Sequence, residues 1–279
     1  MQFSENWLKE FIDINISTEE LCEQLTMLGL EVDGYEKLKS KITGDDSIIK
    51  LDITPNRGDC FSILGIAREL SALNGVKVIL PSRQKITETI DSPINVDICD
   101  ESPRYVGRYI EGINLSKKVS PLIVERLKLS DIRSIDPIVD ITNYVLLETG
   151  QPLHAFDAEK ISNGLSVRLA KDKEKIKLLD EQVLKLSKDC LVITDKSQPV
   201  ALAGIMGGLD SGISSSTKSI YLESAFFKPE IIRGKARRYG LQTDASIRFE
   251  RGVDYQLQSL AIERASELIM NFMNCNFAP

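Results

Sequence analysis

The residues able to do chemistry in this 279-residue chain gather in a few short segments, and one of them, GQPLHAFD, holds the only histidine, His154. Histidine is the side chain best suited to proton transfer near neutral pH. A single histidine excludes a multi-histidine metal site, and no GxSxG serine accompanies it. A lone histidine is more often structural than catalytic. However, Gly150, Gln151 and Pro152 predict a constrained turn after a helix, where a scaffold typically presents a reactive group.

Two further segments combine unusual residues. The glycine-rich segment ALAGIMGGLDSG includes Gly204 and Gly207, and it can bring the backbone close to a ligand. It has neither the context of a dinucleotide-binding fingerprint nor the Lys-Ser/Thr of a phosphate loop, so a tight turn with a bulge is the better interpretation from sequence alone. In SIYLESAFF, Glu223 interrupts a strongly apolar strand. Burying an unpaired carboxylate is costly, so Glu223 either faces water at a strand edge or meets a polar partner.

A fourth segment, RGKARRYGLQTDASIRFERG, concentrates positive charge in a chain whose net charge is -6. Its cationic residues are Arg233, Lys235, Arg237, Arg238, Arg248 and Arg251. A solvated helix face is the usual explanation for such a run. A phosphate backbone is the alternative, because the local charge opposes the charge of the whole chain.

The elements that position these residues form two regions of an α+β fold. Residues 1–85 predict a small α+β module. We expect, in order, a helical turn over 3–11, a helix capped by Ser17 and ending at Gly29, a strand over 30–38, a polar loop or join over 39–47, a strand over 48–54, and a helix from an N-cap at Asp59 to Gly75.

After a linker over 80–93, residues 86–275 predict a larger mixed α/β region. We expect a strand over 104–115, a helix capped by Ser120, a segment over 136–150 that begins as a strand and ends as a helix, hairpins over 175–187 and 190–204, a buried strand over 219–227, a basic helix over 228–240 and an amphipathic helix over 255–273.

Composition limits the class of protein. The chain is 42% hydrophobic and 27% charged, which is ordinary globular composition, and no apolar run reaches the length of a membrane span. The first residues lack a cleavable signal pattern. The five cysteines are widely spaced and form no CxxC pair, which predicts reduced thiols in a cytoplasmic protein without a zinc site or disulfide framework.

Together, these segments resemble the N-terminal part of the bacterial phenylalanyl-tRNA synthetase beta subunit. The segments that carry the resemblance run nearly end to end: FSENWLKEFID, LTMLGLEVDG, LDITPNRGDCFSILGIARELSALNG, PRYVGRYIEGI, IRSIDPIVDITNYVLLETGQPLHAFD, LAGIMGG and ESAFFKPEIIRGKARRYGLQTDASIRFERGVD. The last three are long, specific and in the family's order.

The resemblance implies that the larger region is an editing domain, which hydrolyses tyrosine wrongly esterified to phenylalanine tRNA. Such a second site is needed because an apolar synthetic pocket cannot strongly reject an isostere that merely adds a hydroxyl. Carried over by position, the editing pocket comprises Arg133, Pro152, His154, Gly204, Gly207, Glu223, Thr243 and Ala245.

The resemblance also implies roles for these residues. Glu223, with the Gly204 amide, would recognise the tyrosine hydroxyl. His154 and Arg133 would lie beside the ester and the terminal adenosine, and Thr243 and Ala245 would shape the pocket wall. We expect water to attack the ester without a metal or a covalent intermediate. His154 would either take a proton or only position water, and the lack of a clear acid to orient it favours positioning.

The basic segment would meet the tRNA backbone through Arg237, Arg238 and Arg248. The expected partners are the acceptor end of tRNA(Phe) and the synthetase alpha subunit in an alpha2–beta2 enzyme, with no membrane. We expect no cofactor in this chain, and ATP and Mg in aminoacylation by the full enzyme. One alternative is a structural and tRNA-docking module with no editing activity. Another is a freestanding protein-interaction module of the same fold.

The sequence departs from the family pattern in two places. The family's tRNA-binding insertion of OB type is missing near residues 39–47, which puts tight tRNA binding by this chain in doubt. The chain also reaches Pro279 without the later modules that contact the alpha subunit, and without the class II aminoacylation motifs. We therefore expect it to carry the editing site and not the aminoacylation site of a class II ligase.

Overall fold

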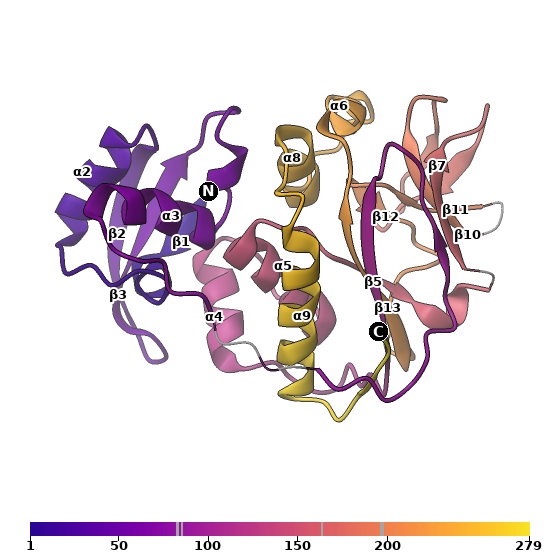
Figure 1. Ribbon diagram of the computed structural model, residues 1–279, viewed down its shortest axis with the longest axis horizontal. Coiled ribbons are helices and arrows are strands. Elements are labelled where there is room, and N and C mark those ends of the chain that lie inside the picture. Colours follow the sequence, from indigo (N-terminus) through magenta and orange to yellow (C-terminus); the bar gives the residue numbers. More distant parts are fainter. Residues whose placement is uncertain (82–83, 85, 163, 196–197) are drawn as a thin grey trace. The chain divides into compact units, whose positions relative to one another are not determined.

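The structure is a computed structural model that describes residues 1–81, 84, 86–162, 164–195 and 198–279 (Figure 1). It divides into two compact units. Unit 1 comprises Met1–Arg83 and Lys118–Gly150, and Unit 2 comprises Gln84–Lys117 and Gln151–Pro279. Both contain helices and sheets, which confirms the expected α+β class. The expected division placed all residues after 85 in the second region. In the structure, residues 118–150 belong to Unit 1 instead.

Unit 1 contains a three-stranded antiparallel sheet in the order β1-β3-β2. Its strands are β1 (Gln2–Ser4), β2 (Glu31–Ser40) and β3 (Gly44–Asp52). The expectation of a polar loop over 39–47 is wrong. β2 and β3 form a hairpin in which Lys39 pairs with Asp45, so only residues 41–43 connect the strands. Asp46 is buried and accepts hydrogen bonds from the Ser4 hydroxyl and the Asn6 amide, which explains a polar strand here.

The helices of Unit 1 are α1 (Glu5–Lys9), α2 (Thr18–Met27), α3 (Ile63–Asn74), α4 (Pro121–Leu129) and α5 (Pro137–Thr149), with a 3₁₀ turn at Gly58–Cys60. Ser17 caps α2 and Gly75 ends α3 in the left-handed region, both as expected. The cap of α3 is Ser62 and not Asp59, which lies in the 3₁₀ turn.

Two contacts explain why residues 118–150 join Unit 1. α4 packs on β1, and α5 packs on α3. The buried Trp7 ring stacks on Tyr144 of α5 with centroids 4.7 Å apart, and Arg126 of α4 lies over the same indole and donates to the Tyr144 hydroxyl at 2.8 Å. The expectation that the segment over 136–150 begins as a strand is wrong. Asp136 accepts from two amides of the first turn and Pro137 occupies its first position, so the whole segment is helical.

Unit 2 contains two larger sheets and a hairpin. The five-stranded sheet has the order β12-β11-β10-β7-β4, the four-stranded sheet has the order β14-β5-β13-β6, and β8 pairs with β9. The strands are β4 (Val96–Asp97), β5 (Arg104–Glu111), β6 (His154–Asp157), β7 (Leu165–Leu169), β8 (Lys175–Lys177), β9 (Val183–Lys185), β10 (Leu191–Asp195), β11 (Gln198–Leu202), β12 (Met206–Gly207), β13 (Ser219–Phe226) and β14 (Asn276–Phe277). A continuous apolar core packs between these sheets and the helices of the unit.

The helices of Unit 2 are α6 (Pro229–Ile232), α7 (Lys235–Arg238), α8 (Asp244–Arg251) and α9 (Leu257–Met270), with a 3₁₀ turn at Ala158–Lys160. The long α9 packs along β5 and β13 (Figure 1). The expectation of a single basic helix over 228–240 is wrong, because the segment forms two short helices, α6 and α7. Gly234 has φ of +74° and separates α6 from α7. Among the described residues, no helix is long and apolar enough to cross a membrane.

Candidate active site

The register of the four-stranded sheet places the two most distinctive residues side by side. Glu223 in the middle of β13 is directly opposite His154, the first residue of β6. Directly opposite residues of antiparallel strands project from the same face with Cβ atoms about 4.5–5.5 Å apart. Glu223 therefore lies in a central strand and not at a solvated edge, and only 6% of its surface is exposed. This resolves the alternatives that its sequence context left open.

A small cavity of about 70 Å³ lies beside this pair. Six of the eight expected pocket residues line it: Pro152, His154, Gly204, Gly207, Glu223 and Ala245. The remaining lining is mostly apolar and comes from Leu153, Ile193, residues 201–203, Ile205, Met206 and Phe249. An apolar cavity with a few convergent polar groups is the usual form of a small-molecule site.

Burial shifts the pKa of the acid in this cavity. Burial raises the pKa of Glu223 to about 8, although a hydrogen bond donated by the Tyr105 hydroxyl to Oε2 at 2.9 Å acts in the opposite direction. Near neutral pH the Glu223 side chain is therefore largely a neutral carboxylic acid, which both donates and accepts hydrogen bonds. Perturbed pKa values of this kind, in a cavity, are characteristic of functional sites.

Burial has the opposite consequence for the histidine. It lowers the pKa of His154 to about 4, so the imidazole is neutral at pH 7. Its Nε2 is buried and has no hydrogen-bond partner among the described residues. The ring packs edge-on against Phe156, with centroids 4.5 Å apart. A base with a pKa of about 4 is a weak proton acceptor at neutral pH, so this environment suits a hydrogen-bonding role for His154 better than proton abstraction.

The two glycines of the pocket are required for different structural reasons. Gly204 lies in the turn between β11 and β12 with φ of +68°, and in the described residues its amide makes no hydrogen bond. Gly207 leaves room for the histidine ring: a Cβ atom at this position would lie 2.4 Å from Cε1 and 2.7 Å from Nε2 of His154. The glycine-rich segment thus does more than form a tight turn, because Gly207 accommodates the imidazole.

Thr243 supports the pocket without lining the cavity. Its Oγ1 accepts from the Ser246 amide as the N-cap of α8, and the same hydroxyl donates to the Ile205 carbonyl at 2.8 Å. Ile205 follows Gly204 in the turn between β11 and β12. Thr243 therefore fastens the helix that carries Ala245 to the turn that carries Gly204. Sequence inspection did not predict α8, although the Thr-Asp-Ala-Ser cap was a readable signal.

Arg133 is exposed between α4 and α5 in Unit 1, whereas the residues that line the cavity all belong to Unit 2. Its role beside the ester stays a prediction. Tyr105 was not among the expected site residues. Its partnership with Glu223 depends on the pairing of β5 with β13, which the sequence does not encode locally.

The basic residues divide by environment. Arg237 is exposed and makes no ion pair with any described residue, and Arg238 donates two hydrogen bonds to Asp189 at 2.7 and 3.0 Å. Arg248 differs from the expectation. It is 2% exposed, and its guanidinium donates to the Asp244 carboxylate and carbonyl, both at 2.9 Å. In this structure Arg248 stabilises α8 and is not presented to a phosphate.

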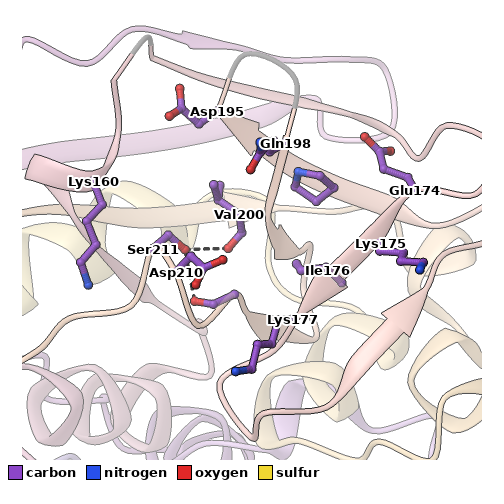
Figure 2. Close-up of a pocket in the computed structure, with 12 residues that line it drawn as sticks. Lys160, Glu174, Lys175, Ile176, Lys177, Asp195, Gln198, Val200, Asp210 and Ser211 are labelled. Atoms are coloured by element: carbon purple, nitrogen blue, oxygen red, sulfur yellow. Dashed lines mark hydrogen bonds between the residues drawn. The ribbon is translucent and has the colours of Figure 1, made fainter.

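A larger groove of about 540 Å³ also lies in Unit 2 (Figure 2). Its lining mixes lysines with carboxylates: Lys160, Lys175, Lys177, Glu174, Asp195 and Asp210. Glu174 is bound by Arg168 at 2.6 Å, and Lys160 donates to the Gly212 carbonyl at 2.6 Å. None of the expected site residues lines this groove. Volume does not single out the small cavity, since another cavity, beside Tyr109 and Glu111, has about 740 Å³. The buried Glu223 and the half-buried His154 select the smaller one.

Comparisons with known proteins identify the family of the chain. The B3/4 domain family matches residues 101–274. The chain is 52% identical over 228 residues to the phenylalanine–tRNA ligase beta subunit of Idiomarina loihiensis, covering 81% of this chain and 29% of that protein. It is 47% identical over 280 residues to the beta subunit of Photorhabdus laumondii, covering 99% of this chain and 35% of that protein. The chain thus spans about a third of the length of these relatives.

Among solved structures, an N-terminal fragment of the phenylalanyl-tRNA synthetase beta subunit from Pyrococcus horikoshii aligns with the whole chain and with 75% of its own length, at 16% identity and a TM-score of 0.47. The family match is more informative, since it spans β5, β6, β13 and α8, the elements that surround the cavity. From that match, the chain belongs to the B3/4 domain family.

Proposed function

We propose that the chain is the N-terminal part of a phenylalanine–tRNA ligase beta subunit and that its small cavity hydrolyses tyrosine esterified to tRNA(Phe). The observation that carries the proposal is the position of the buried Glu223 directly opposite the half-buried His154 in one cavity, where burial raises the pKa of the acid and lowers the pKa of the imidazole. The similarity to phenylalanine–tRNA ligase beta subunits supports the choice of substrate.

The acid suits recognition of a phenol. A neutral carboxylic acid donates one hydrogen bond and accepts others, and a phenolic hydroxyl does the same. Phenylalanine would leave Oε1 of Glu223, the carboxyl oxygen that Tyr105 does not bind, unpaired inside an apolar cavity. Sites built to bind a hydroxyl reject the analogue that lacks it by as much as about 10⁴–10⁵. The Gly204 amide, which has no partner among the described residues, supplies a second donor on the proposed ligand side.

The proposed reaction is attack of water on the ester carbonyl, with release of free tyrosine and the intact tRNA hydroxyl. The tetrahedral oxyanion would be stabilised by hydrogen-bond donors. With its low pKa, His154 holds water or ester by hydrogen bonding, and orientation supplies acceleration because an aminoacyl ester is already activated. A metal ion has no role in this proposal.

The size of the cavity adds a condition. An apolar cavity that admits benzene has a volume of about 150 Å³. The present cavity is about 70 Å³, so entry of a tyrosine ring requires side chains to move. Met206 is a partly exposed wall residue with an unbranched, flexible side chain, and it is the natural candidate for this movement.

The test is deacylation of Tyr-tRNA(Phe) and Phe-tRNA(Phe) by the full alpha–beta enzyme that carries this chain. We expect hydrolysis of the tyrosyl ester and sparing of the phenylalanyl ester. Glu223→Ala should relax this discrimination, and His154→Ala should slow hydrolysis of the tyrosyl ester. No hydrolysis above background by the parent enzyme would instead favour a structural and tRNA-docking module.

A further inference from the structure

Three neighbouring strands of the four-stranded sheet surround Glu223 with few polar groups. On β6 the opposite residue is His154, and on β5 it is Gly107. Two tyrosines flank the acid: Tyr221, two residues before it on β13, and Tyr105, two residues before Gly107 on β5. The described titratable groups that face Glu223 are thus His154, Tyr105 and Tyr221, and no cation is among the causes of its raised pKa.

The two tyrosines have different functions in this arrangement. The Tyr221 ring fills the space beside Gly107, since a Cβ there would lie 1.8 Å from the Tyr221 hydroxyl oxygen. Tyr221 is therefore a packing residue. The Tyr105 ring is half-buried against the core of Unit 2, and its hydroxyl donates to Oε2 of Glu223 at 2.9 Å.

Only one oxygen of the carboxyl group is occupied in this way. Oε2 accepts from Tyr105, whereas Oε1 has no hydrogen-bond partner in the described parts of the chain. Glu223 lines the cavity, but Tyr105 does not. Tyr105 thus holds the carboxyl group from the side away from the ligand.

We propose that Tyr105 is a positioning residue, which fixes Oε2 and leaves Oε1 as the oxygen that meets the phenolic hydroxyl of the substrate. This inference rests on the proposed editing function. The terminal torsion of a glutamate side chain is broad, so without a fixed partner the carboxyl plane rotates. Because Oε2 is held as an acceptor, the proton of the neutral acid is directed to Oε1, where it can be donated to the ligand.

The experiment compares Tyr105→Phe with Tyr109→Phe in the full alpha–beta enzyme. Tyr109 is a matched control on the same strand and face, and its hydroxyl contacts Glu111 at 2.9 Å, outside the cavity lining. We expect Tyr105→Phe to lower kcat/KM for Tyr-tRNA(Phe) roughly tenfold, the effect of losing about one hydrogen bond, with the slow hydrolysis of Phe-tRNA(Phe) unchanged. Tyr109→Phe should behave as the parent.

A second readout separates positioning from loss of packing. The Tyr105 hydrogen bond lowers the pKa of Glu223, so Tyr105→Phe should move the alkaline limit of tyrosyl-ester discrimination to higher pH. Unchanged discrimination and an unchanged pH profile would overturn the inference while the proposed function stands.

If the parent enzyme hydrolyses no tyrosyl ester, the proposed function is wrong, but the contact between Tyr105 and Glu223 can still be tested. The carboxyl stretching band of protonated Glu223, assigned by its loss in Glu223→Gln, then tests the Tyr105 contact on the chain itself. A shift of this band in Tyr105→Phe and not in Tyr109→Phe would support the contact. An identical band in the parent, Tyr105→Phe and Tyr109→Phe would overturn it.

Discussion

At the scale of single residues, the site depends on Gly207, a glycine required by the position of the His154 ring beside it. Gly207 does not have a positive φ, so alanine is compatible with its backbone. The obstacle is the imidazole of His154, which occupies the space that a Cβ would need. A residue that looks like part of a flexible glycine-rich loop is therefore a specific partner of the histidine.

We predict that Gly207→Ala displaces the His154 ring and lowers hydrolysis of Tyr-tRNA(Phe) by about 10²-fold, the effect of a displacement of roughly 1 Å in a positioned group. The measurement is a double-mutant cycle with His154→Ala. If Gly207 acts through the ring, Gly207→Ala should have little further effect when His154 is already alanine. Additive losses would show that Gly207 acts independently of His154.

At the scale of elements, α8 and the turn between β11 and β12 are joined by one hydroxyl. Thr243→Ala removes the N-cap of α8 and the donor to the Ile205 carbonyl. We predict a loss of about 1 kcal/mol of unfolding free energy from the cap, together with slower tyrosyl-ester hydrolysis. Chemical denaturation and the deacylation assay measure the two effects. Thr243→Ser keeps the hydroxyl and should restore both, whereas a Ser variant as impaired as the Ala variant would contradict the role of the hydroxyl.

The arginines of the basic segment are not equally available to bind a phosphate. Arg237 is exposed without an ion-pair partner among the described residues, but Arg238 is held by Asp189. If this segment contacts phosphates, Arg237→Ala should weaken tRNA(Phe) binding and reduce the slope of log affinity against log salt by about 0.7–0.9. Arg238→Ala is the control and should change the slope less. Equal slopes in the parent and Arg237→Ala would exclude a phosphate contact at Arg237.

The sequence predicts elements well where local signals agree. Ser17 with Glu20 marks the start of α2, and the alternation of SIYLESAFF marks β13. It fails where tertiary contacts decide. Residues 39–47 are polar, yet all but 41–43 are strand, because Asp46 is buried among amide and hydroxyl donors. The β-branched residues after Pro137 favoured a strand, but the Asp136 cap and packing in Unit 1 make them helix.

The site was predictable in its residue types but not in its geometry. Glu223 was recognisable because a carboxylate interrupts an apolar strand, and the resemblance to a known family supplied its partners. The register that sets Glu223 beside His154, and the diagonal contact from Tyr105, depend on strand pairings between segments far apart in sequence. Arg248 shows the opposite error, because charge in a sequence does not reveal that a guanidinium is buried against its own helix.

At the scale of the whole molecule, the acid and the imidazole of the pocket impose opposite pH dependences on stability. Glu223 has a folded pKa of about 8 against its usual 4.5, so its contribution is fully present below pH 4.5 and is lost as pH rises towards 8. His154 has a folded pKa of about 4 against its usual 6.5, so its contribution is present above pH 6.5 and is lost as pH falls towards 4. Between pH 4.5 and 6.5 the two slopes oppose each other.

Glu223→Gln removes one of these slopes and keeps the shape of the side chain. We predict that the variant gains stability relative to the parent by at most about 1.4 kcal/mol per pH unit between pH 4.5 and 8, because unfolding of the parent releases the Glu223 proton in this range. Denaturation followed by circular dichroism measures the difference, in which the other titrating groups cancel. Emission of Trp7, the only tryptophan, reports on Unit 1 and separates its unfolding from that of Unit 2. A stability difference that stays constant from pH 4.5 to 8 would show that Glu223 is ionised in the folded protein, and the neutral acid on which phenol recognition rests would be wrong.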